Sequence, residues 1–196
     1  MNNQEIDRFV FKQKLINIVS PTNTWGVGYT GNLGFSEKTK YANEDICWEW
    51  SKYFNDFFGS EPEGFKVMSN LFVHQQCPRI NKCAWEKYIL PLRKAGWIHK
   101  KRANIHWDRV IDVRCADFRI FSLDDILVKK LFFVNMLLNG VHGYSFLINF
   151  NLELAIYTHD DQGYGVCCGA NSHVRARGIE FLKFLGKKDN IIIKIR

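Results

Sequence analysis

The densest group of chemically useful side chains lies between His99 and Arg109. These eleven residues hold four fixed positive charges, two imidazoles and an indole. Such cations neutralise phosphates, and an indole stacks on bases, so the pattern is typical of a nucleic-acid contact. A charged, solvated loop would explain the same composition. The residues expected to contact a partner are Trp97, Lys100, Lys101, Arg102, His106, Trp107 and Arg109.

A second candidate site is the turn expected at His159, Asp160 and Asp161. Loops at strand ends expose side chains on a rigid frame, which is where catalytic groups are often found. Turn chemistry is the simpler interpretation, because Asp and the following Gly163 favour turns through backbone hydrogen bonds and positive φ. We therefore expect no catalytic residue at this turn.

The six cysteines raise the question of thiol chemistry and of metal binding. A thiol enzyme needs a cysteine beside a histidine and a third orienting group, and the sequence marks no such trio. Cys77 and Cys83 have His74 nearby but lack a second close pair of ligands for zinc. We expect free thiols, no metal and no cofactor. The neighbours Cys167 and Cys168 should point to opposite faces of a strand.

The stretch from Trp25 to Phe35 is rich in glycine. Gly26 to Gly31 spell Gly-x-Gly-x-x-Gly, the letters of a dinucleotide-binding loop. Such a loop requires a strand before it and a helix after it, and neither is indicated here. The stretch is therefore predicted to be a plain loop.

Hydrophobic periodicity locates the elements that must position these residues. Apolar spacing with capping residues predicts helices at 43–58, 83–94, 125–139 and 171–185. Alternation predicts strands at 65–73, 97–102, 110–121, 146–150, 152–156, 166–168 and 191–195. Residues 5–19 fit a helix or a strand. Pro91 should kink the second helix or move its boundary. In the third helix, Ile126, Leu127 and Leu131 are expected on the buried side.

This irregular order of strands and helices favours an α+β fold over a βαβ alternation. We predict one domain, residues 1–196, with a largely antiparallel sheet and packed helices. The chain is 46% hydrophobic, which supplies a core, while no apolar run approaches the ~20 residues that cross a bilayer. Glu5 stands where a secretory signal would carry positive charge. A cytoplasmic protein with no membrane partner is expected.

The positive charge is unevenly distributed along the chain. Residues 79–119 hold 11 Lys and Arg against 4 Asp and Glu, an excess as large as the net charge of +7 for the whole chain. A basic face attracts nucleic acid or an acidic protein surface. The charge alone does not choose between the two.

The segments 146–149 and 156–166 carry the letters Phe-Leu-Ile-Asn and then Ile-Tyr-Thr-His-Asp-Asp-Gln-Gly-Tyr-Gly-Val. This arrangement resembles an uncharacterised bacterial domain family with a Phe-Ile-Asn strand, a second strand and a Tyr-Asp-Asp-Arg-Gly turn. The sequence departs from that pattern at Gln162, where the family has Arg, and at His159, where it has an aromatic residue. If the family's Arg acts on a ligand, that role is absent here.

Families of this kind are similar to the small cytoplasmic immunity proteins of bacterial toxin systems, including contact-dependent growth inhibition. The resemblance implies a protein that is not an enzyme and that neutralises a cognate toxin by stoichiometric binding. The aromatic content agrees, because Trp, Tyr and Arg dominate tight protein interfaces. The alternative is a nucleic-acid-binding protein or ribonuclease that uses residues 99–109. A thiol enzyme is the third possibility.

Overall fold

The computed structural model describes residues 29–35, 44–59, 64–73, 80–99, 119–137, 141–143, 145–159, 163–168, 172–188 and 191–195. Within these residues, seven strands form one sheet in the order β10-β1-β9-β8-β7-β2-β5, and every neighbouring pair in it is antiparallel. Its strands are β1 (Tyr29–Phe35), β2 (Phe65–Ser69), β5 (Arg119–Ser122), β7 (Ser145–Asn149), β8 (Leu154–His159), β9 (Gly163–Cys168) and β10 (Ile191–Ile195).

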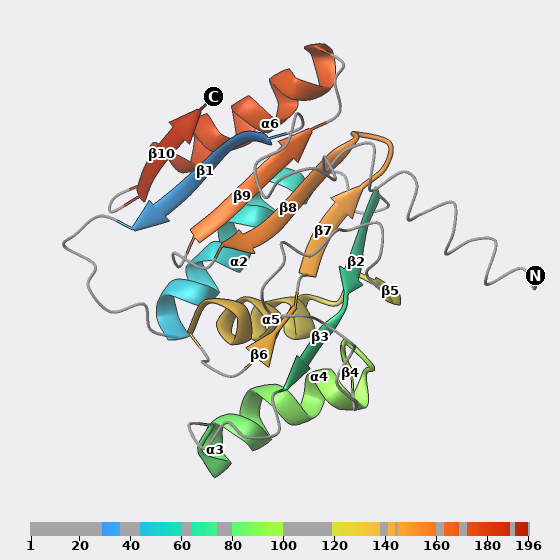
Figure 1. Cartoon of the computed structure of the whole chain (residues 1–196). Coiled ribbons are helices and arrows are strands. Elements are labelled where there is room, and N and C mark those ends of the chain that lie inside the picture. Colours follow the sequence, from blue (N-terminus) through green and yellow to red (C-terminus); the bar gives the residue numbers. More distant parts are fainter. Residues whose placement is uncertain are drawn as a thin grey trace, which may run out of the picture.

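A smaller sheet continues from the end of β2 (Figure 1). Its central strand, β3 (Leu71–Val73), pairs in parallel with β4 (Ile98–His99) and antiparallel with β6 (Val141–His142). The helical elements are α2 (Glu44–Phe58), α3 (Lys82–Ala84), the π-helix η2 (Trp85–Ile89), α4 (Leu90–Lys94), α5 (Asp125–Leu137) and α6 (Ser172–Leu185). Helices packed on a largely antiparallel sheet confirm the predicted α+β class.

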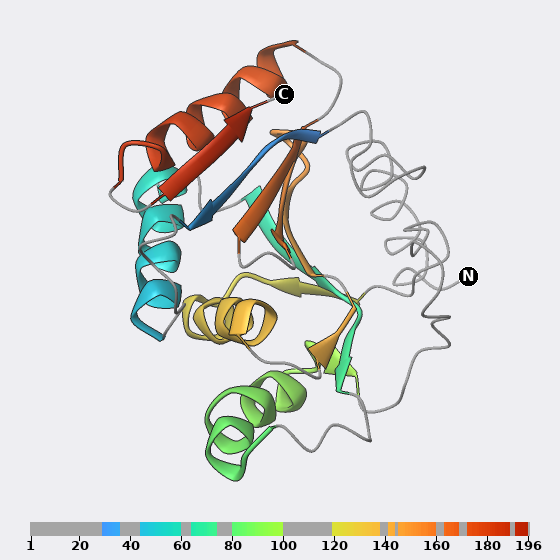
Figure 2. The same ribbon diagram turned by 60° about the vertical axis from the view of Figure 1, so that its left-hand side comes forward.

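The long helices form a layer on one face of the seven-stranded sheet. Figure 2 shows α6, α2 and α5 on the same side of it, with the segment from α3 to α4 below α5. Phenylalanines bind this layer to the sheet: the ring of Phe65 on β2 lies 4.9 Å from Phe54 and 4.8 Å from Phe58, both on α2. Phe181 on α6 lies 4.9 Å from Phe58, so one aromatic cluster joins three elements.

The second face of the sheet is apolar as well. Val67 and Leu147 face the helical core, whereas their neighbours Met68 and Phe146 alternate to the other face and are also buried. Cys168 belongs to the helix-side core, and a Cβ added to Gly178 of α6 would overlap its sulfur. The sheet therefore behaves as a central layer with two buried faces.

From Tyr29 to Phe35 the Gly-rich stretch is a strand and not a loop, which corrects the prediction for these residues. Residues 25–28 lie outside the described residues. Tyr29–Phe35 forms β1, an inner strand between β10 and β9, in which Leu33 pairs with Ile193 and Tyr164. The register with β9 shifts between Tyr29 and Gly31, as at a β-bulge, where glycine is common. Pairing on both sides supplies the backbone hydrogen bonds, so tertiary context overrides the low strand propensity of glycine.

The predicted helix at 83–94 contains a π-helical turn immediately before Pro91. Asn81 caps the first turn, because its side chain accepts a hydrogen bond from the Ala84 amide at 2.8 Å. Proline has no N–H, and its ring collides with the carbonyl four residues earlier, here that of Lys87. The wider turn at Trp85–Ile89 accommodates Pro91 without breaking the helix.

Most other predicted elements are found close to their expected bounds. The predicted helices at 43–58, 125–139 and 171–185 correspond to α2, α5 and α6, and the hairpin corresponds to β7 and β8. The predicted segment 5–19 and most of the strand at 110–121 lie outside the described residues. None of the helices in the described ranges is long and apolar enough to span a bilayer.

Candidate interaction surface

Trp97 was expected to be an exposed contact residue, and this is wrong. Its side chain is 2% exposed and packs against Phe121, with ring centroids 5.7 Å apart. The Trp97 amide donates to the Leu92 carbonyl at 2.8 Å, and its carbonyl accepts from the Ser69 hydroxyl at 2.7 Å. Because Gly96 takes φ +82° at the end of α4, the chain turns back and carries the indole into the core.

The rest of the basic segment is not described. His99 ends β4, where it pairs with Phe72. The residues outside the described ranges are Lys100, Lys101, Arg102, His106, Trp107 and Arg109. Their contact with a partner stays a prediction.

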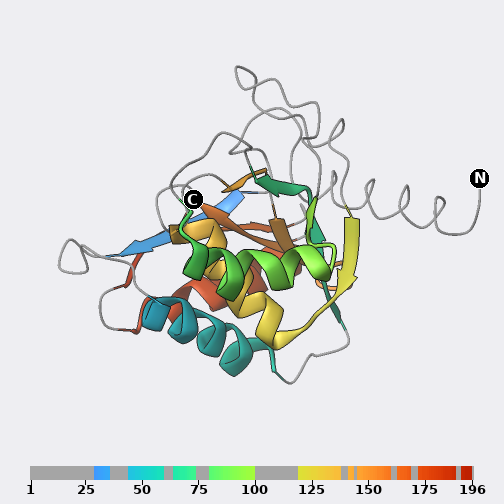
Figure 3. The ribbon, with the colours of Figure 1, turned by 90° about the horizontal axis from the view of Figure 1, so that it is seen from below.

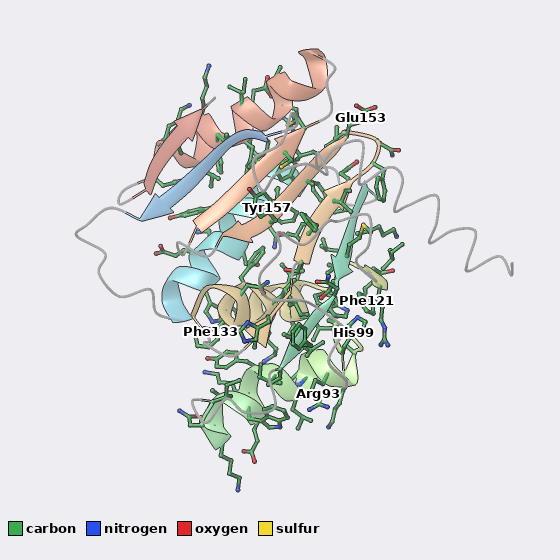
Figure 4. All side chains as sticks on the ribbon, in the orientation of Figure 1. Arg93, His99, Phe121, Phe133, Glu153 and Tyr157 are labelled. Atoms are coloured by element: carbon green, nitrogen blue, oxygen red, sulfur yellow. The ribbon has the colours of Figure 1, made fainter. Side chains whose placement is uncertain are left out.

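Asn149, the last residue of the Phe-Leu-Ile-Asn stretch, has a structural role. Its side-chain oxygen accepts hydrogen bonds from the amides of Asn151 and Leu152, each at 3.0 Å, and so shapes the turn between β7 and β8. The side chain is buried against Gly64, where a Cβ would overlap it. The conformation of Glu153, with φ 45°, completes this tight turn, which Figure 4 marks at the end of the hairpin.

The candidate turn that follows β8 is only partly described. His159 is the last residue of β8 and pairs with Gly163 at the start of β9. Asp160, Asp161 and Gln162 lie outside the described residues. The strands before and after these three residues, β8 and β9, pair antiparallel. The turn itself stays a prediction.

The described thiols are of two kinds. Cys83 is exposed on α3, whereas Cys167 and Cys168 are buried on β9, and none of these three described thiols forms a disulfide. Burial, with a smaller contribution from Cys168, raises the pKa of the Cys167 thiol to about 12. Since the thiolate is the nucleophile, Cys167 is poorly suited to thiol catalysis at neutral pH.

Two large hydrophobic side chains are exposed among the described residues, and both lie on the helical layer. Trp48 of α2 is 49% exposed and Ile126 of α5 is 65% exposed. Ile126 was predicted to be buried, and the structure corrects this: Leu131 is 1% exposed on the inner side of α5, while Ile126 lies in the first turn and points away from it.

Lysines of α5 flank these two apolar groups. Lys129 and Lys130 follow Ile126 at the i+3 and i+4 positions, so the three residues share one face of the helix. The Lys129 ammonium lies 4.5 Å from the centroid of the Trp48 ring, a cation–π contact between α5 and α2. Lys129 therefore orients the exposed indole.

Lys130 extends this face to η2. Its ammonium donates a hydrogen bond of 2.8 Å to the Lys87 carbonyl, the group that Pro91 would serve in an α-helix if it had an N–H. Below this contact, Tyr88 and Phe133 stack with ring centroids 3.8 Å apart and an interplanar angle of 16°. Figure 4 marks Phe133 on α5. The link between α5 and η2 is thus made by a charged hydrogen bond above an aromatic pair.

We call this face the α2–α5–η2 surface and define it by Trp48, Lys87, Ile126, Lys129 and Lys130. Figure 3 shows α5 between α2 and the segment from α3 to α4. An exposed indole is a side chain that often anchors a protein contact, and Ile126 adds an exposed aliphatic side chain beside it. The sequence gives one indication of this surface. Trp48 does not follow the helical spacing of the other apolar residues in its helix, so an exposed position could be expected.

Other cations cover aromatic rings on the α6 side of α2. Arg177 lies 4.4 Å from the centroid of Phe57, and Lys188 lies 4.9 Å from that of Tyr53. These two rings are half-buried and pack against the core cluster. These two cations therefore cover the aromatic rings where α2 meets α6, whereas the Trp48 ring is exposed.

Comparisons of the chain with protein-family models, with curated proteins and with solved structures gave no match. The resemblance of residues 146–166 to a bacterial domain family therefore stays a prediction. Across the described residues, no three His, Cys, Asp or Glu side chains gather in a metal-binding arrangement.

Proposed function

We propose that this chain is a cytoplasmic immunity protein that neutralises a cognate bacterial toxin by stoichiometric protein binding. The observation that carries the proposal is the exposure of Trp48 and Ile126 on one helical face, with Lys129 holding the indole in place. Large side chains that are fixed before binding lose little conformational freedom on association, which favours high affinity.

Two features of the sequence support the same proposal. The aromatic content is 15%, and aromatic side chains are enriched at tight protein interfaces. The resemblance of the C-terminal half to a bacterial domain family points to the immunity class. Neutralisation by binding requires neither a metal nor a cofactor. The proposal is that it takes place in the cytoplasm, where a toxin would act.

The test is co-expression with the toxin domain encoded by the neighbouring upstream gene. Cells that produce both proteins should grow, and the two should purify as an equimolar complex. A Kd in the nanomolar range or below, about −12 kcal/mol or stronger, is expected because a cell must leave almost no toxin free. A catalytically inactive toxin variant allows the affinity to be measured without selection on growth.

The control is a variant that folds but lacks the apolar contacts, Trp48→Ala with Ile126→Ala. Both side chains are exposed, so the unfolding midpoint should stay near that of the wild type, while growth in the presence of the toxin should fail. If the wild-type protein neither binds the toxin domain nor restores growth, the proposed function is wrong.

A further inference from the structure

We infer that the face formed by the C-terminal end of α4 and the first residue of β5 binds the phosphate backbone of a nucleic acid. We call it the α4–β5 surface and define it by Arg93, Lys94 and Arg119. The inference goes beyond the proposed function and does not depend on it, because it assigns a second binding site with a different ligand.

Packing around Gly96 brings the three cations to one end of the molecule. Arg93 and Lys94 are the last two residues of α4, and the chain turns at Gly96, where φ is +82°. A Cβ added at Gly96 would lie 3.5 Å from the Phe121 ring and 4.0 Å from Nη1 of Arg119. Figure 4 marks Arg93 and Phe121 at this end of the molecule. The start of β5 is thus held against the end of α4.

The charge at this end is positive even when every acid of the surrounding sequence is counted. The strands of the small sheet, α4 and β5 contain no Asp or Glu. From Lys87 to Trp107 the sequence has six Lys and Arg and no carboxylate side chain. Residues 79–119 as a whole hold 11 Lys and Arg against 4 Asp and Glu. A surface with this excess of cations attracts polyanions.

The carboxylates on the adjoining elements do not neutralise the α4–β5 surface. Glu86 of η2 pairs with Lys82 at 3.9 Å, toward the start of the helical segment and away from Lys94. The acids at the start of α5 follow the opposite end of β5 from Arg119. Neither Lys94 nor Arg119 forms an ion pair with a carboxylate of the described residues. Their charges are therefore available to a ligand.

The absence of apolar anchors favours a nucleic acid over a protein partner. Trp97 and Ile98, the large hydrophobic residues that follow the turn, are buried. Among the described residues, the exposed large hydrophobic side chains are Trp48 and Ile126, which belong to α2 and α5. Tight protein contacts depend on such anchors. Binding to a phosphate backbone depends instead on cations that release counterions, which is what the α4–β5 surface offers.

The guanidinium groups have the geometry that phosphates require. Arg93 lies 5.3 Å from the centroid of the Trp85 ring, which orients its side chain. The N–H donors of a guanidinium lie in the plane of the group, so a contact between its face and a ring leaves them able to bind phosphate oxygens in pairs. Arg119 presents a second planar group from β5, and the exposed Lys94 adds a compact ammonium.

The experiment measures binding of the purified chain to a fluorescent single-stranded RNA of about 20 nucleotides by anisotropy, across a salt series. A single-stranded DNA and an RNA duplex of the same length show which form of the backbone binds best. The wild type should bind with a micromolar Kd at low salt. The logarithm of its association constant should fall with the logarithm of salt with a slope of about −2 or steeper, since three contacts each contribute roughly −0.7.

A matched pair of charge reversals locates the site. Lys94→Glu with Arg119→Glu should weaken the Kd about tenfold or more and make the salt slope less steep by about 1.4, because two contacts are lost. Lys183→Glu with Lys187→Glu makes the same change in net charge on exposed residues of the α6 end and should change the Kd less than about threefold. Circular dichroism and thermal unfolding check the fold, and Lys94→Gln with Arg119→Gln replaces the first variant if it does not fold.

The outcomes separate this inference from its alternatives. If the wild type binds none of the three nucleic acids at low salt, or if the α4–β5 variant binds them as tightly as the α6 control does, the inference is wrong. If polyglutamate at an equal concentration of charge displaces the RNA, the surface binds acidic protein segments and the inference is likewise overturned. The toxin takes no part in these titrations, and the α4–β5 variant should still restore growth in its presence, so the proposed function and this inference can fail separately.

Discussion

Cys83 and Cys167 carry the same thiol group in opposite surroundings. Cys83 is exposed on α3, while Cys167 is buried on β9 with its pKa raised to about 12. Burial disfavours the charged form, so at pH 7 the Cys167 side chain is a neutral thiol. Exposure therefore makes Cys83 a site that reagents can label, while burial makes Cys167 unreactive.

Alkylation should show this difference directly. With excess iodoacetamide at pH 7.5, peptide mapping should find Cys83 modified within minutes and Cys167 unmodified under native conditions. Raising the pH to 9 should leave Cys167 protected, since its pKa is still far above. Labelling of both at equal rates in the denatured protein is the control. Rapid native modification of Cys167 would contradict its burial.

At the scale of elements, Pro91 of α4 leaves the Lys87 carbonyl without its helical donor, and Lys130 of α5 supplies one. Pro91 cannot donate to the Lys87 carbonyl, and the Lys130 ammonium does so from α5 at 2.8 Å. The π-helical turn of η2 and the position of a lysine on the α2–α5–η2 surface are therefore coupled. Replacing Pro91 should therefore change how much Lys130 contributes to the free energy of unfolding.

A double-mutant cycle measures this coupling. Lys130→Met should lower the free energy of unfolding by about 1 kcal/mol in the wild type, since a carbonyl loses its donor. In a Pro91→Ala background the new amide can serve Lys87, so the cost of Lys130→Met should be smaller. Urea unfolding of the four proteins gives the values. An equal cost in both backgrounds would show that the two residues act independently.

The sequence predicts elements best where the controlling interactions are local. The helix at α5 begins where expected, because the Asp124 side chain accepts from the Leu127 amide at 2.8 Å, a bond made within four residues. Ile126 was misplaced because its apolar character fits the stripe, whereas its orientation depends on which neighbouring helix packs beside it. Trp97 was predicted to be exposed because basic residues follow it in sequence. The turn at Gly96, which directs the indole into the core, was not recognised.

At the scale of the whole molecule, the helical layer lies close against the sheet at Gly178. A Cβ at this position of α6 would overlap the Cys168 sulfur and crowd Leu154 and Val166, each 3.3 Å away. The absence of a side chain lets α6 lie directly on β8 and β9. This spacing sets how tightly the two layers pack.

Gly178→Ala should therefore destabilise the protein by about 1–3 kcal/mol through overpacking, although alanine favours helices. Combining it with Cys168→Ala, which removes the sulfur, should recover part of the loss. Thermal unfolding of both variants and of Cys168→Ala alone is the measurement. If Gly178→Ala instead stabilised the protein, the claim that α6 and the sheet are too close for a Cβ at this position would be wrong.

Topology is the level that the sequence conveyed least. The predicted hairpin of β7 and β8 was found because its partners are adjacent in the chain. Nothing local in Tyr29–Phe35 indicates its partners β9 and β10, which lie more than 100 residues later. The α2–α5–η2 surface likewise joins three separate segments, so its residues could be recognised individually but not assembled.

The position of β1 has a consequence for biosynthesis. β1 leaves the ribosome before both of its neighbours, so it can pair with neither until residues 163–168 and then 191–195 have been translated. At about 5–20 residues per second, that delay lasts on the order of ten seconds. During it, an unpaired strand with two open edges must avoid other chains, and the glycines that weaken its strand propensity make such premature pairing less favourable.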